Sequence, residues 1–123
     1  MFFLEEWTLS LSVKKADPRS GTRIPCAIPI TLRSLDPVHP FSERCEIILV
    51  NLRGCAVRLT HAVRIGMPVE LRGLPSNTNV TARTVNCISL GKHENIWLLA
   101  LELDEPGNVW GIEAVPADWF SSP

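Results

Sequence analysis

The feature that most constrains this chain is a series of short runs in which apolar and polar residues alternate. The clearest run covers residues 24–32 and places five apolar side chains on one side: Ile24, Cys26, Ile28, Ile30 and Leu32. A period of two is that of a β-strand with one buried face. Ten prolines and seven glycines within 123 residues interrupt the chain too often for long helices. The sequence therefore predicts short strands joined by many turns.

Strands are predicted at residues 7–13, 24–32, 45–50, 55–59, 69–72, 80–90 and 95–103. Pro25 and Pro29 cannot donate ladder hydrogen bonds, so the second of these is expected to be an edge or interrupted strand. Residues 51–54 predict a turn, since Asn51 and Gly54 both tolerate positive φ. Residues 110–120 allow at most a helical turn or two. Six or seven short strands indicate an all-β fold, an antiparallel barrel or sandwich, in a single domain over residues 1–123.

Charge is unevenly distributed along a chain whose net charge is −1. Residues 14–92 hold all twelve Lys and Arg against five acidic residues, which gives +7 by subtraction, whereas residues 93–123 hold six acidic residues and no Lys or Arg. Such a distribution fits either an ordinary solvated surface or a basic anion site bordered by acidic groups. Nucleic-acid binding is disfavoured, because the net charge is negative and Phe41 is the only aromatic residue in the basic stretch.

No motif indicates catalysis, a metal site or a membrane span. The four cysteines are widely spaced and form no ligand pattern with the three histidines. Cys55 is expected to be a packed thiol rather than a nucleophile working with His61. The N-terminus lacks the features of a signal peptide, and no stretch of about 20 apolar residues occurs. We therefore expect a cytoplasmic protein without cofactor that is not an enzyme.

Two motifs point to a ligand. Arg19 and Arg23 form R-x-x-x-R just before the strand at 24–32, and Asn51-Leu52-Arg53-Gly54-Cys55-Ala56 lies between two predicted strands. Guanidinium groups match phosphate oxygens and the O6/N7 edge of guanine, and their planes stack on purines. An Asn side chain can accept from guanine N–H groups. From the residues alone, a solvated loop is the favoured explanation of the arginine pair.

In order and spacing, residues 19–104 resemble the PilZ domain, a family of small six-stranded β-barrels that mostly act as receptors for cyclic di-GMP. The family motifs are R-x-x-x-R, which Arg19 and Arg23 meet in full, and [D/N]-x-S-x-x-G, which is met only in part. Asn51 fits its position, whereas Arg53 replaces the serine and Ala56 replaces the glycine. The resemblance implies a PilZ-like barrel in bacterial signalling, with a ligand site of Arg19, Arg23, Asn51, Arg53 and Ala56.

The departures from the second motif leave two readings open. Arg53 would either fill a guanine slot or add a cation for a phosphate. The Ala56 methyl group would cost on the order of 1 kcal/mol if the position needs positive φ, or would obstruct the ligand if the position needs close approach. The first reading is a receptor that relays cyclic di-GMP to an unidentified protein partner. The second is a PilZ-like adaptor that no longer binds nucleotide and acts through protein–protein contacts.

Overall fold

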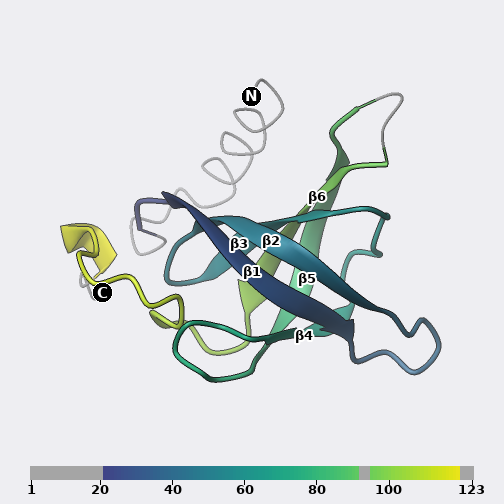
Figure 1. Cartoon of the computed structure of the whole chain (residues 1–123), viewed down its shortest axis with the longest axis horizontal. Helices are drawn as coiled ribbons and strands as arrows, with labels where there is room; N and C mark the ends of the chain where they lie inside the picture. The colour runs from purple at the N-terminus through teal and green to yellow at the C-terminus, as the bar shows by residue number, and fades with distance from the viewer. Residues whose placement is uncertain (1–20, 92–94, 120–123) are drawn as a thin grey trace.

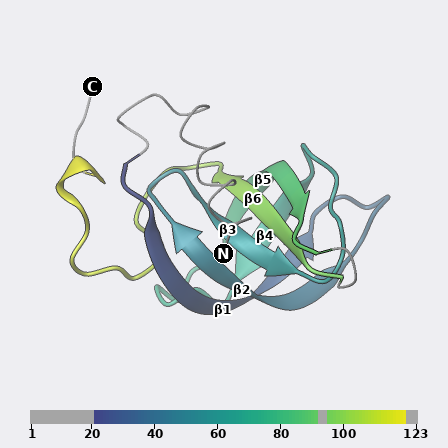
Figure 2. The same ribbon diagram turned by 90° about the horizontal axis from the view of Figure 1, so that it is seen from above.

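The fold is a closed antiparallel barrel, seen in a computed structural model that describes residues 21–91 and 95–119. Its strands are β1 (Ile24–Ser34), β2 (Ser42–Val50), β3 (Gly54–Leu59), β4 (Pro68–Arg72), β5 (Val80–Ser89) and β6 (Trp97–Leu103). They close in the order β1-β2-β3-β6-β5-β4 (Figure 1), and Figure 2 shows β5 and β6 on the side opposite β1 and β2. The all-β class and the barrel are thus confirmed. The strand predicted at residues 7–13 lies outside the described residues.

Strand β1 is interrupted where its prolines lie, as predicted. It pairs with β2 along its length, with a register shift between Pro25 and Ile28. It pairs with β4 only through Thr31–Ser34. Pro25 and Pro29 therefore lie in the part of β1 that has a paired neighbour on one side only, where a missing N–H donor is tolerated.

The barrel interior is filled by the inward residues of all six strands. Its fully buried members include Leu32, Ile47, Val57, Leu71 and Leu99. In β3, Val57 and Leu59 are buried and Arg58 between them is exposed, as the alternation predicts. Besides these apolar residues, Ser34, Asn51 and Thr84 are buried polar residues of the described chain.

A second, smaller cluster lies on the outside of the barrel. It consists of Leu49, Ala56, Leu98 and Ala100, which are separate from the interior cluster and come from β2, β3 and β6. We call these four residues the outer cluster. Strand β6 is consequently buried on both faces over Leu98–Leu101. Its continuous apolar run is the sequence pattern of such a strand.

The C-terminal segment closes one end of the barrel. Its 3₁₀ turn η2 (Ala117–Trp119) carries a buried tryptophan whose Nε1 donates to the Thr22 carbonyl oxygen at 2.7 Å, and Thr22 Oγ1 donates to Asp118 Oδ2 at 2.8 Å. These contacts fix the chain at the start of β1 (Figure 1). The single turn agrees with the predicted limit of one or two helical turns. In the described ranges, no helix has the length and apolarity needed to cross a membrane.

Candidate ligand-binding site

The turn between β2 and β3 is organised by the side chain of Asn51. Its Oδ1 accepts hydrogen bonds from the backbone N–H groups of Arg53 and Gly54, both at 2.9 Å, and its own N–H donates to the Gly54 carbonyl oxygen at 3.0 Å. Asn51 is 6% exposed. This is the side-chain-to-backbone turn for which Asn is favoured. The acceptor atom of Asn51 is therefore used by the protein's own backbone.

The turn predicted at residues 51–54 is present, but neither Asn51 nor Gly54 belongs to the described residues with positive φ. A Cβ at Gly54 would instead lie 1.9 Å from the carbonyl oxygen of Leu101. Glycine is needed because β3 and β6 approach closely at this point.

The same turn is bonded to the segment that follows β6. The Leu103 N–H donates to the Arg53 carbonyl oxygen at 2.7 Å, and the Gly107 N–H donates to that of Leu52 at 2.8 Å. Trp110 Nε1 donates to the Asn51 carbonyl oxygen at 2.8 Å. The turn is therefore a fixed platform rather than a free loop, which suits it to position a binding group.

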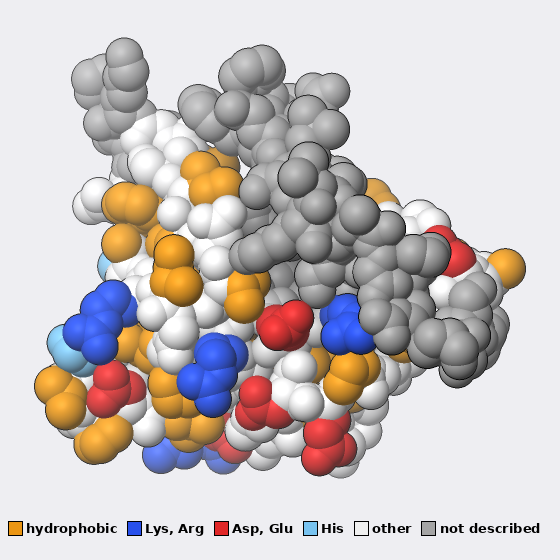
Figure 3. All heavy atoms as spheres, turned by 180° about the vertical axis from the view of Figure 1, so that it is seen from behind, with side chains coloured by type: hydrophobic (Ala, Val, Ile, Leu, Met, Phe, Trp, Pro, Cys, Tyr) orange, Lys and Arg blue, Asp and Glu red, His pale blue; other side chains and the backbone are white. Residues whose placement is uncertain are grey.

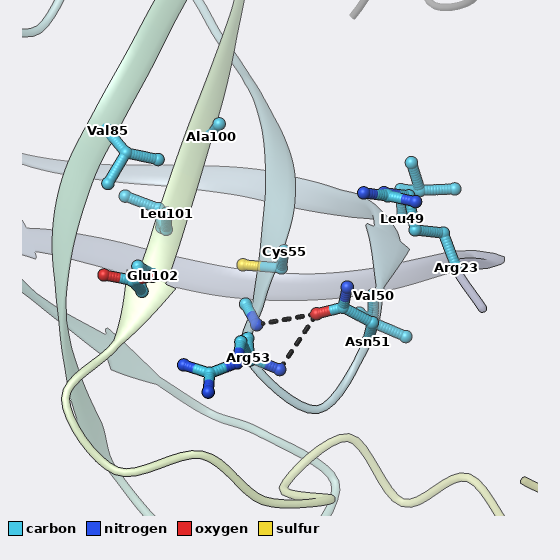
Figure 4. A pocket seen from close by; sticks show the side chains of 11 residues that line it. Arg23, Leu49, Val50, Asn51, Arg53, Cys55, Val85, Ala100, Leu101 and Glu102 are labelled. Atoms are coloured by element: carbon cyan, nitrogen blue, oxygen red, sulfur yellow. Dashed lines mark hydrogen bonds between the residues drawn. The ribbon is translucent and has the colours of Figure 1, made fainter. Parts of the chain in front are cut away.

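A shallow pocket lies beside this platform, on the outside of the barrel. Its empty volume, which includes open solvent at the mouth, is ≈ 360 Å³. The residues that line it are Arg23, Leu49, Val50, Asn51, Arg53, Gly54, Cys55, Val85, Ala100, Leu101 and Glu102. These residues come from the start of β1, the end of β2, the turn, β3, β5 and β6. Figure 4 shows Arg23 and Arg53 on either side of Asn51, with Glu102 on the side of Arg53.

Arg23 is the most unusual of the charged groups here. Its Nε and Nη2 are buried, and neither makes a hydrogen bond within the described part of the chain. Burial lowers the pKa of the Arg23 guanidinium, which nevertheless stays protonated at neutral pH because arginine titrates so far above it. A buried cation without hydrogen-bond acceptors is costly. An anion placed in this pocket would supply those acceptors.

Of the five predicted site residues, three meet in this pocket: Arg23, Asn51 and Arg53. Arg19 lies outside the described residues. Ala56 does not line the pocket but is fully buried in the outer cluster, opposite Ala100 across the β3–β6 ladder. It is also absent from the described residues with positive φ, so the Ala56 methyl group carries no backbone strain.

The sequence motifs missed the remaining walls of the pocket. Val85, Ala100 and Glu102 are far from both motifs in the sequence and reach the site through the pairing of β6 with β3 and β5. The unbroken apolar run of β6 indicated burial on both faces, but it gave no sign of which strands would lie beside it. Glu102, directly opposite Gly54 in the ladder, brings an acidic group to a site predicted to be basic.

Folding also mixes the charges that the sequence separates. Arg83 lies opposite Glu102 in the β5–β6 ladder, and Arg33 Nη1 lies 3.5 Å from Glu70 Oε1. On the face drawn in Figure 3, basic and acidic side chains are interspersed. A nucleic-acid backbone is bound by a continuous basic surface. On that face, the basic stretch of the sequence does not form such a surface.

The other candidate chemistry is structural in the described residues. Cys55 is buried, and burial together with the neighbouring Cys26 and Cys45 raises the pKa of its thiol well above the usual value. His61 Nδ1 lies 2.8 Å from Glu43 Oε1, and its ring packs edge-on against Phe41. Across residues 21–91 and 95–119, no three His, Cys, Asp or Glu side chains gather in a way that could hold a metal ion.

Comparisons of the chain with protein-family models, with curated proteins and with solved structures gave no significant match.

Proposed function

We propose that this barrel is a signalling domain that binds cyclic di-GMP in the pocket beside the β2–β3 turn and relays its presence to a partner protein. The observation that carries the proposal is the partly buried Arg23 side chain, whose buried Nε and Nη2 lack acceptors in the described part of the chain, next to Asn51 and Arg53. These residues come from the two motifs that resemble those of PilZ domains. Their meeting in one pocket is what a shared ligand role requires.

The pocket offers complementary surfaces for the parts of such a ligand. Arg23 and Arg53 are planar cations that match phosphate oxygens and can stack on guanine. Val85, which is only partly buried, supplies an apolar contact for a purine face. Glu102 is acidic and repels a phosphate. We therefore expect the phosphate to lie on the Arg23 side of the pocket.

The role foreseen for Asn51 changes in this arrangement. Its Oδ1 already accepts two backbone hydrogen bonds, so it is not the acceptor for a guanine edge. Only its amide nitrogen remains to donate to a ligand oxygen. Asn51 then contributes mainly by holding Arg53 and the turn in place.

The test is a calorimetric titration of the full chain with cyclic di-GMP, beside Arg23→Ala and the control Arg72→Ala. Arg72 is an exposed arginine of β4 whose Nε lies 3.6 Å from Glu70 Oε1, and it does not line the pocket. We expect saturable binding by the wild type and by Arg72→Ala, and at least a tenfold weaker affinity for Arg23→Ala. A well-folded wild type that gives no binding heat would refute the nucleotide proposal.

A second candidate function is a PilZ-like adaptor that has lost the nucleotide. Two observations favour it: Asn51 Oδ1 is occupied by the turn, and Ala56 is buried in an apolar cluster instead of facing the pocket. Affinity capture of partners with and without added cyclic di-GMP separates the two. An adaptor retains the same partner in both samples, whereas a receptor gains or loses it with the nucleotide.

A further inference from the structure

The outer cluster is too well buried for a face that is open to water. Leu98 and Ala56 are 0% exposed, and Ala100 is 1% exposed. The side chains of Leu98 and Ala100 point away from the barrel interior, because Leu99 and Leu101, which alternate with them along β6, belong to the interior cluster. Something outside the sheet must therefore cover them.

The described residues around the outer cluster do not supply that cover. The partly buried apolar residues packed against it are Ile48, Val85, Ile88 and Leu90, which lie on β2, on β5 and directly after β5. Side chains on one face of a sheet stand side by side, so they shield one another's flanks but not their outer ends. The apolar residues of the C-terminal segment, among them Trp110 and Trp119, pack on the interior cluster instead.

We propose that residues 1–13 of this same chain are the cover of the outer cluster. Eight of these thirteen residues are apolar: Met1, Phe2, Phe3, Leu4, Trp7, Leu9, Leu11 and Val13. From residue 7 the apolar positions alternate with Thr8, Ser10 and Ser12, which gives the segment one apolar and one polar side. A segment of this composition has an apolar side to bury and a polar side for water.

The position of the chain supports this occupant. The described chain begins at Gly21, and Pro25 pairs with Leu49, a member of the outer cluster. The chain before Gly21 therefore starts close to the edge of this face. Residues 14–20 are seven residues and can span up to roughly 24 Å, whereas Leu98 and Ala100 are only about 7 Å apart along β6. Residues 1–13 can thus reach every member of the outer cluster.

This cover adjoins the candidate pocket. Leu49 and Ala100 belong to the outer cluster, Val85 packs against it, and all three line the pocket. The proposed cover does not depend on whether the pocket binds a nucleotide.

The test is NMR spectroscopy of the full-length chain with labelled methyl groups. We expect nuclear Overhauser effects between the methyl groups of Leu98, Ala56 or Ala100 and the ring protons of Phe2, Phe3 or Trp7. A sample mixed from labelled and unlabelled chains separates contacts within one chain from contacts between two copies. Contacts found only between copies, or no contacts at all, would overturn the proposal.

A pair of variants gives a second readout. Trp7→Ser/Leu9→Ser should shift the Leu98 and Ala100 methyl signals and raise the binding of a hydrophobic dye several-fold. The matched control Thr8→Ala/Ser10→Ala changes the polar side and should do neither. The methyl signals of Val57 and Leu99, which face the interior, should stay in place and report that the barrel is folded. Unchanged Leu98 and Ala100 signals in the first variant would count against residues 1–13 as the cover.

Discussion

Gly54 stands at the start of β3, where its α-carbon faces the carbonyl oxygen of Leu101 on β6. The backbone N–H groups of Arg53 and Gly54 both donate hydrogen bonds to the Asn51 side chain. A glycine and an asparagine at these positions are therefore required by the backbone of the turn. The turn that shapes the pocket therefore depends on both residues to hold its own shape.

Replacing Gly54 by alanine should destabilise the barrel strongly. The new Cβ would lie 1.9 Å from a backbone oxygen that cannot turn aside, so β3 and β6 must separate locally. We expect a loss of about 2–4 kcal/mol in the free energy of unfolding, measured by urea denaturation. Gly107→Ala is the control, since a Cβ there meets nothing within 4 Å, and it should stay within about 0.5 kcal/mol of the wild type. Equal stability of the two variants would contradict the close-approach explanation.

Asn51 lends itself to a comparison of two substitutions. Asn51→Ala leaves the N–H groups of Arg53 and Gly54 without their acceptor in a buried turn, and we expect it to lower the free energy of unfolding by about 2–3 kcal/mol. Asn51→Asp keeps an oxygen at the same place and should recover at least half of that loss, as measured in the same denaturation series. If the aspartate variant were as unstable as the alanine variant, the amide nitrogen rather than Oδ1 would be the important atom.

At the scale of elements, the carboxylate of Asp36 stabilises the connection between β1 and β2 through local contacts. Asp36 Oδ1 accepts from the Val38 N–H at 2.9 Å, and Oδ2 lies 3.3 Å from His39 Nδ1. The hydrogen bond from Val38, followed by the contact with His39, lowers the pKa of Asp36. A carboxyl group whose pKa is lowered on folding stabilises the fold above its unfolded pKa of about 3.9. That contribution is lost as the pH falls through the folded pKa.

The pH dependence of the Asp36→Asn variant tests this sign. We expect the variant to melt at a lower temperature than the wild type at pH 7, and the difference to shrink as the pH is lowered toward 2 and the Asp36 carboxylate becomes protonated. Thermal unfolding followed by circular dichroism gives both values. Glu105→Gln, an exposed change after β6, should leave the melting temperature nearly unchanged at both pH values. If the difference in melting temperature stayed constant from pH 7 to pH 2, the negative charge of Asp36 would not be what stabilises the fold.

Strand-level structure was the part that the sequence predicted best. All six described strands were predicted, some of them from alternation, and the prolines of β1 marked where its pairing is one-sided. The partners of each strand were not predictable in the same way, because register is decided by contacts between residues far apart in the chain. Glu102 and Val85 reach the pocket only through such pairing. Ala56 shows the same limit: its position in a motif suggested a ligand contact, and its ladder neighbours place it in the outer cluster.

At the scale of the whole molecule, the barrel is a closed ring, so no strand can leave without opening the interior. Cys55 is buried within that interior, where burial raises the pKa of its thiol. The pKa of Cys45 rises to about 12, mainly through burial and also through Glu43. A thiol reacts as its thiolate, and a pKa of 12 leaves roughly 10³-fold less thiolate at pH 8 than an ordinary cysteine has. The thiols therefore report on the opening of the barrel.

We expect Cys55 to react with a thiol reagent at pH 8 only when the barrel unfolds. Its modification should be slower than that of free cysteine by at least about 10³-fold, the equilibrium ratio of folded to unfolded chains for a domain of marginal stability. Mass spectrometry of the labelled peptides follows each cysteine separately, and all four should react at once in denaturant. Gly54→Ala should speed the labelling of Cys55 by roughly 30- to 1000-fold, since 1.4 kcal/mol is a factor of ten in the unfolding equilibrium, whereas Gly107→Ala should not. Rapid labelling of Cys55 in the native wild type would mean that the barrel opens locally at β3, and that the β2–β3 turn is not the fixed platform described above.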